Sequence, residues 1–277
     1  MKSSNNRGKI FVTAVLAGSL LVGSPAYAES DEQLDVSAGT TPDSVFYTID
    51  QLNERLQLSI TSDDEKKADL LLAYAQERLS ESNEMVQQGK DEYVNKLIDQ
   101  YTETLSKAED QIAKVVSSND VSKETKQKFA EKLDRATDYN KDIEEKLDEK
   151  TQLMLKEKRI EAKVVASLIE GLDVESVRKM RESGFGFGEI VKIQAIAKAS
   201  GKTVDEIASY AEQGKDFAAI SQSVGLKSTD VLAKSLEEKE EKLEKALEEA
   251  EELGNKEMIE KLTNALERTE RDKEEFK

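Results

Sequence analysis

The chain has no cysteine, no histidine and no tryptophan, and only two prolines in 277 residues. Without cysteine it can form no disulfide and carry no lipid on a cysteine side chain, so packing alone must stabilise the fold. Without histidine it can form no Ser-His-Asp or Cys-His catalytic arrangement and no histidine-based zinc site. We therefore predict a protein that is not an enzyme and that uses no cofactor and no metal.

Basic residues are too few to balance the acidic ones: 41 Lys and Arg stand against 58 Asp and Glu, a net charge of −17. Such a surface repels the phosphates of nucleic acids and of anionic lipid headgroups. Residues 204–226 have the rhythm of a helix-turn-helix, but this charge opposes DNA binding. We expect no nucleic acid among the partners, whereas basic proteins and cations remain compatible with the charge.

Long apolar runs are also scarce, and the one near the start, residues 10–23, is short for a membrane span. It follows a basic start and precedes small residues at Ala26 and Ala28, the pattern of a secretory signal peptide. We predict that residues 1–28 are a signal peptide, that cleavage after Ala28 leaves Glu29 first, and that the protein is secreted or extracytoplasmic. The basic residues that cleavage removes are Lys2, Arg7 and Lys9, which lowers the net charge from −17 to −20.

After a polar, aperiodic lead-in at residues 29–41, which we expect to be disordered, the apolar residues recur at helical spacing and strand-like alternation is absent. The sequence predicts an all-α fold whose first domain, residues 42–118, is a three-helix bundle with helices at about 43–59, 62–88 and 91–116. The first helix carries one apolar stripe, which we expect to face the core. Its residues are Phe46, Ile49, Leu52 and Leu56.

Residues 119–170 contain heptad-like apolar columns and no glycine or proline, which predicts a long, coiled-coil-like connecting helix. The apolar pattern weakens near residues 149–158, so a break there is an open alternative. At the other end of the chain, residues 228–277 are rich in acidic residues around a helical apolar pattern. Gly254 and Asn255 divide this segment, and we predict an acidic helical hairpin.

Between these segments, residues 171–226 repeat a pattern after thirty residues, which predicts two units of paired short helices joined at a glycine. Each unit is too small to bury its own apolar face, so we expect the two to pack together. The first unit carries Gly171, Val174, Val177, Met180, Gly184, Phe187 and Ile190, matched in the second by Gly201, Val204, Ile207, Tyr210, Gly214, Phe217 and Ile220.

The segment from Pro42 to Asp110 contains Pro42-Asp43-Ser44-Val45-Phe46-Tyr47, Leu52-Asn53-Glu54-Arg55-Leu56 and a run from Leu70 to Glu81. On these residues, it resembles an uncharacterised family of bacterial extracytoplasmic helical domains, a domain of unknown function. The thirty-residue pattern is similar to glycine-punctuated helical repeats of secreted proteins from Gram-positive bacteria. The resemblance implies a helical fold outside the cytosol and supplies no catalytic residues.

These observations predict a non-enzymatic secreted or cell-envelope-associated protein that acts by protein–protein contact with an unknown envelope or extracellular partner. The candidate contact residues are Phe185, Tyr210 and Phe217, for which burial in the core is the alternative. The competing function is a module that binds a cell-wall polymer or cations. Association between copies of the chain remains open, and no membrane span is expected in the mature chain.

Overall fold

The computed structural model describes residues 38–118, 121–169 and 174–276, and all regular structure in these ranges is helical. They form twelve α-helices, which confirms the all-α class. No helix among these residues combines the length and the apolar character needed to cross a membrane. The predicted signal peptide, residues 1–28, and most of the predicted lead-in lie outside the described residues.

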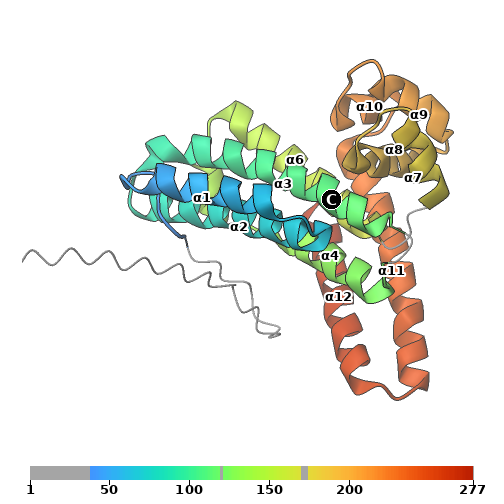
Figure 1. The fold of residues 1–277 in the computed structure, drawn as a ribbon. Helices are drawn as coiled ribbons and strands as arrows, with labels where there is room; N and C mark the ends of the chain where they lie inside the picture. Colours follow the sequence, from blue (N-terminus) through green and yellow to red (C-terminus); the bar gives the residue numbers. More distant parts are fainter. Residues whose placement is uncertain (1–37, 119–120, 170–173, 277) are drawn as a thin grey trace, which may run out of the picture. The chain divides into compact units, whose positions relative to one another are not determined.

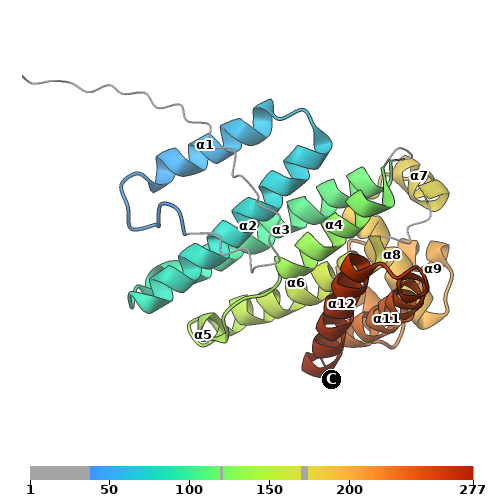
Figure 2. The ribbon, with the colours of Figure 1, turned by 90° about the horizontal axis from the view of Figure 1, so that it is seen from below.

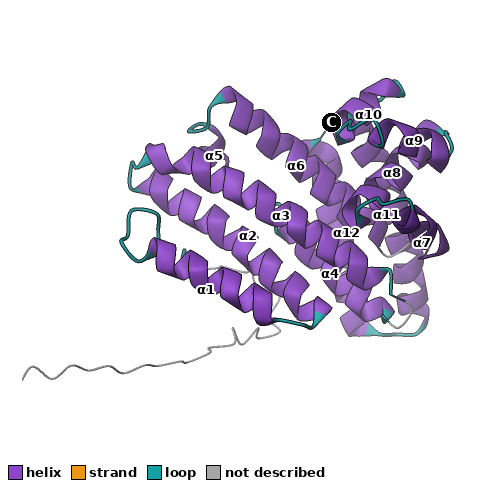
Figure 3. Ribbon diagram, turned by 45° about the horizontal axis from the view of Figure 1, so that its top comes forward, coloured by secondary structure: helices purple, strands orange, loops and turns teal. Residues whose placement is uncertain are grey.

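The first three long helices, α1 (Tyr47–Ile60), α2 (Asp64–Gln87) and α3 (Val94–Val116), lie in a row with α2 in the middle (Figure 3). A short 3-10 helix, η1 (Asp91–Tyr93), leads into α3. The apolar spacing of α3 gives it a continuous buried face, as predicted from the sequence. The buried residues of this face are Val94, Leu97, Ile98, Tyr101, Leu105, Ala108 and Ile112.

The prediction of one long helix over residues 119–170 is wrong. The described chain forms α4 (Lys123–Arg135), the single turn α5 (Lys141–Glu144) and α6 (Glu149–Leu168) instead. In Figure 2 the chain turns at α5, so that α4 and α6 lie side by side, and the two helices are in contact. The break falls before residues 149–158 because two polar side chains begin new helices. Asn140 and Asp148 have extended backbones, and their side chains accept hydrogen bonds from the backbone N–H groups of Asp142 and Thr151.

Four shorter helices follow: α7 (Val174–Glu182), α8 (Phe187–Ser200), α9 (Val204–Ala211) and α10 (Phe217–Ser223). Gly184 separates α7 from α8 and Gly214 separates α9 from α10, with φ angles of +95° and +76°. Both residues adopt the left-handed conformation that a residue with a side chain rarely takes, which explains glycine at both positions. The thirty-residue repeat stays a prediction, since Gly171 lies outside the described residues.

The last two helices, α11 (Ser228–Glu252) and α12 (Lys256–Glu275), pack against each other (Figure 1). The turn between them lies at Gly254 and Asn255, where the sequence predicts it. Gly254 has a φ of +65°, and the side chain of Asn255 accepts a hydrogen bond from the N–H of Met258, which begins α12.

Charged side chains connect helices that are distant in the sequence. The Glu161 carboxylate on α6 accepts hydrogen bonds from Lys158, at 2.6 Å, and from Lys192 on α8, at 3.0 Å. Lys158 also lies 3.5 Å from the buried carboxylate of Glu109 on α3. These contacts join α3, α6 and α8 around a small set of charges that burial shields from water.

Candidate functional site

Helix α1 lies on α2 with its apolar side turned outward, which contradicts the predicted burial of its stripe. We call the exposed residues the outer stripe of α1. Because successive helical residues turn by about 100°, they fall on one face of α1. The outer stripe consists of Phe46 (63% exposed), Ile49 (55%), Leu52 (63%), Leu56 (58%) and Ile60 (72%).

The opposite side of α1 faces α2 and is mostly polar. Tyr47, only 6% exposed, and the partly buried Leu58 are its contacts with the hydrophobic core. The Tyr47 hydroxyl accepts a hydrogen bond from Arg78 on α2, at 2.8 Å, and lies 3.1 Å from Glu81 Oε2. The Arg78 guanidinium, which lies over the Tyr47 ring, also bonds both oxygens of Glu81 at 2.8 Å and forms an ion pair with Glu54 of α1.

Glu77 completes what we call the Arg78 cluster: Tyr47, Glu54, Glu77, Arg78 and Glu81. Burial, together with the nearby carboxylates of Glu54 and Asp50, raises the pKa of Glu77 to about 7. Burial also raises the pKa of Glu81 to about 8, and Arg78 offsets this rise in part. The cluster therefore contains more carboxyl groups than its one guanidinium can balance, and it is stable when some of them carry protons.

Two carboxyl groups of the cluster, from Glu54 and Glu77, and that of the nearby Asp50 offer oxygens within 4.8 Å of one another. Oxygen ligands of this kind suit a hard divalent cation. Glu54, however, is already paired with Arg78, whose positive charge opposes a bound cation. The absence of a bound metal therefore stays a prediction from the sequence.

The Arg78 cluster predicts that folding stability falls as pH rises. The folded-state pKa of Glu77 is about 7, above its ordinary value of 4.5. The protonated Glu77 side chain therefore contributes its full share of folding stability below about pH 4.5, and this share is lost as pH rises through 7. The variant E77Q, which cannot ionise, should gain roughly 1–2 kcal/mol of unfolding free energy relative to the wild type between pH 5 and 8. Urea unfolding followed by circular dichroism measures the difference.

The matched control for that experiment is E65Q, because Glu65 is an exposed residue of the same helix. Its difference from the wild type should stay within about 0.5 kcal/mol at each pH. A difference between E77Q and the wild type that does not change with pH would contradict the assignment of a proton to Glu77.

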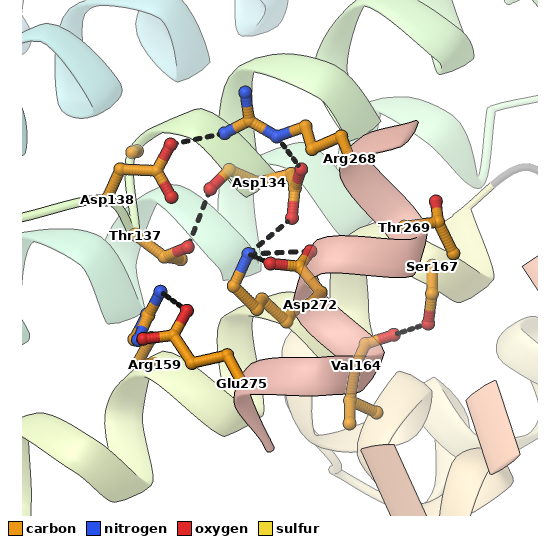
Figure 4. Close-up of polar contacts among 12 residues, drawn as sticks. Asp134, Thr137, Asp138, Arg159, Val164, Ser167, Arg268, Thr269, Asp272 and Glu275 are labelled. Carbon is orange, nitrogen blue, oxygen red and sulfur yellow. Dashed lines mark hydrogen bonds and ion pairs between the residues drawn. The ribbon is translucent and has the colours of Figure 1, made fainter. Parts of the chain in front are cut away.

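A second group of buried charges, the Lys163 network, joins α4, α6 and α12 (Figure 4). It consists of Asp134, Lys163, Arg268 and Asp272. The fully buried Lys163 ammonium donates to Asp134 Oδ1 and to Asp272 Oδ2, both at 2.9 Å. Burial acts to raise the pKa of Asp134, yet Lys163, Lys239 and Arg268 together hold it below its ordinary value. Asp134 is thus a buried carboxylate that depends on its cationic neighbours.

The Lys163 network predicts a large loss of stability when its central cation is removed. The variant K163M keeps most of the side-chain volume but leaves Asp134 and Asp272 buried without their shared partner. It should lower the unfolding free energy by about 3–5 kcal/mol in urea unfolding. The control K107M, which removes an exposed pair with Glu103, should cost at most about 1 kcal/mol. Equal effects of the two variants would show that the network contributes no more than a surface ion pair.

The three contact residues predicted from the sequence are not brought together on an exposed surface. Phe217 is 4% exposed and Phe185 7% exposed, so both are core residues. Tyr210 is partly buried against the core, and the Lys215 ammonium lies 4.5 Å from the centre of its ring. Phe185 lines a hollow of about 280 Å³ together with Met180 and Val204. Phe185 and Phe217 are therefore buried, which was the alternative that the sequence left open.

Sequence reasoning therefore missed the residues that are exposed, although it identified the stripe to which they belong. The signal that could have corrected it lies on the other side of the same helix. Asp50, Gln51 and Glu54 make that side polar, and Glu54 forms an ion pair with Arg78 of α2.

Comparison with known proteins gives one family match. A family model described as a domain of unknown function, DUF5667, matches residues 39–214, from the segment before α1 to the glycine after α9. This span is longer than residues 42–110, on which the resemblance was noted in the sequence. No curated protein and no solved structure matches the chain.

Proposed function

The chain belongs to the DUF5667 family, and we propose that it is a non-enzymatic protein that acts by protein–protein contact, with the outer stripe of α1 as its binding surface. The observation that carries this proposal is the orientation of α1, which directs its apolar residues outward and its polar residues toward α2. Large apolar side chains that are contiguous on a surface are typical of sites where another molecule binds.

The shape of this surface favours a helical partner. The outer stripe has spacings of three and four residues, the pattern with which one α-helix packs against another. The exposed side chains between and beside the stripe residues are mostly uncharged, and Arg55 is the charged residue among them. An apolar helix face can therefore approach α1 without burying a carboxylate.

Two further observations support contact over catalysis. The absence of histidine and cysteine removes the usual nucleophile–base arrangements. In the Arg78 cluster, the carboxylates of Glu54 and Glu81 are already paired with Arg78. The competing function, binding of a cell-wall polymer or of cations, has less support. The carboxyl trio of Asp50, Glu54 and Glu77 is already occupied in part by Arg78.

The location of this activity is part of the proposal. The signal-peptide pattern of residues 1–28 supports a secreted or envelope-associated protein. Intact mass measurement of the protein outside the cytosol should give a chain that begins at Glu29. Recovery of the full-length chain from the cytosol alone would contradict it.

A photo-crosslinking experiment tests the binding surface. A benzophenone amino acid at position 52, in the cells that produce the protein, should yield discrete adducts whose mass is that of the chain plus a protein partner. The control places the same group at position 253, because Leu253 is 81% exposed and lies between α11 and α12. Because both positions are exposed, neither replacement should disturb the fold. Equal adduct yields at the two positions would contradict a binding surface on α1.

A further inference from the structure

We propose that the helix that binds the outer stripe of α1 is α1 of a second copy of this chain, paired antiparallel about a two-fold axis near Asn53. This inference rests on the proposed function, because it names the partner for that surface. Three features of α1 support it: the order of its apolar residues, the residue at its centre and the placement of its charges.

The outer stripe is nearly the same when it is read in either direction. Measured from Asn53, its residues stand at positions −7, −4, −1, +3 and +7, and reversal gives −7, −3, +1, +4 and +7. No apolar residue is displaced by more than two positions, which is about 3 Å along a helix axis. A two-fold contact needs a surface that is complementary to itself, and this stripe meets that need along its whole length.

The residue at the centre of the stripe suits the two-fold axis. Asn53 is exposed, lies on the same side of α1 as the apolar residues, and carries both a donor and an acceptor in its amide. Two Asn53 side chains that meet across the axis can hydrogen-bond to each other, whereas any shift in register would bury each amide against an apolar side chain. A single asparagine in an apolar helix seam is known to fix register in this way.

The charges of α1 favour an antiparallel pair. Its carboxylates, Asp50 and Glu54, lie on the side of α2, so two copies with a net charge of −17 each can meet here without facing carboxylates. In the antiparallel pair Arg55 lies level with the uncharged Gln51 of the other copy. The antiparallel pair brings Asp63 level with Asp43 of the other copy, whose charge is offset by its ion pair with Lys90. A parallel pair would instead bring together the exposed and acidic Asp63 and Glu65 that follow α1 in each chain.

The contact area of one helix pair is small, so the dimer should be weak. Interfaces well below about 1,200 Å² are typical of transient complexes. Sedimentation equilibrium of the full chain between about 5 and 500 µM should show dimers that form as concentration rises. The variant L52E should raise the dissociation constant at least about tenfold, because it places two carboxylates in the apolar seam. The control L253E adds the same charge at an exposed position outside α1 and should leave the dissociation constant unchanged.

Cross-linking through single cysteines tests the orientation, since the chain has no cysteine of its own. With a short bismaleimide, N53C should cross-link to itself and L253C should not. I60C should not cross-link to itself, because the two residues lie about 21 Å apart along the antiparallel axis. A mixture of I60C and F46C should cross-link. All four positions are exposed, and circular dichroism verifies that each variant is folded.

The outcomes separate this inference from the proposed function. A wild-type chain that stays monomeric at 500 µM and an N53C variant that cross-links no better than L253C would overturn the second-copy pairing. Efficient cross-linking of I60C to itself would overturn the antiparallel arrangement. In either case, photo-adducts at position 52 with a protein of another mass would still support a binding surface on α1. The absence of any adduct specific to position 52 would remove the proposed function as well.

Discussion

The ion pairs of Arg78 determine how α1 lies on the rest of the molecule. This one guanidinium bonds the carboxylates of Glu81 and Glu54 and the hydroxyl of Tyr47, so it links both sides of the α1–α2 contact. A buried cation and buried carboxylates are unfavourable apart and must stay together. The polar side of α1 supplies partners for these buried charges and therefore faces α2. The apolar side of α1 is then left facing outward.

Sets of buried charges recur in this chain, which has no cysteine and therefore no disulfide. The Lys163 network joins α12 to helices that precede it by more than a hundred residues, and Lys158 and Lys192 connect α6 with α8 through Glu161. Each of these two sets matches two cations with two carboxylates, whereas the Arg78 cluster holds three carboxyl groups around one guanidinium. Removing one partner from such a set costs far more than removing a surface pair, so these contacts specify which helices meet.

The spacing of apolar residues predicted the helices and the buried face of α3, where a stripe from Val94 to Ile112 packs on both neighbours. The same reasoning was wrong for α1, because an apolar stripe indicates a helix face and does not say whether that face meets the core. It was also wrong for residues 119–170. There Asn140 and Asp148 cap the starts of new helices, and the heptad-like spacing of apolar residues carries no information about such caps. Phe185 and Phe217 were predicted as contact residues, yet both are buried in the core.

Cysteine accessibility directly measures whether the apolar stripe of α1 faces outward. Single cysteines at positions 52 and 58 would be labelled with a maleimide at low micromolar protein, where copies of the chain stay apart. We predict that the cysteine at 52 reacts about as fast as one at 253, and the cysteine at 58 several-fold more slowly. The reverse order, with position 52 protected and position 58 reactive, would show that α1 buries its apolar stripe and would contradict its outward orientation.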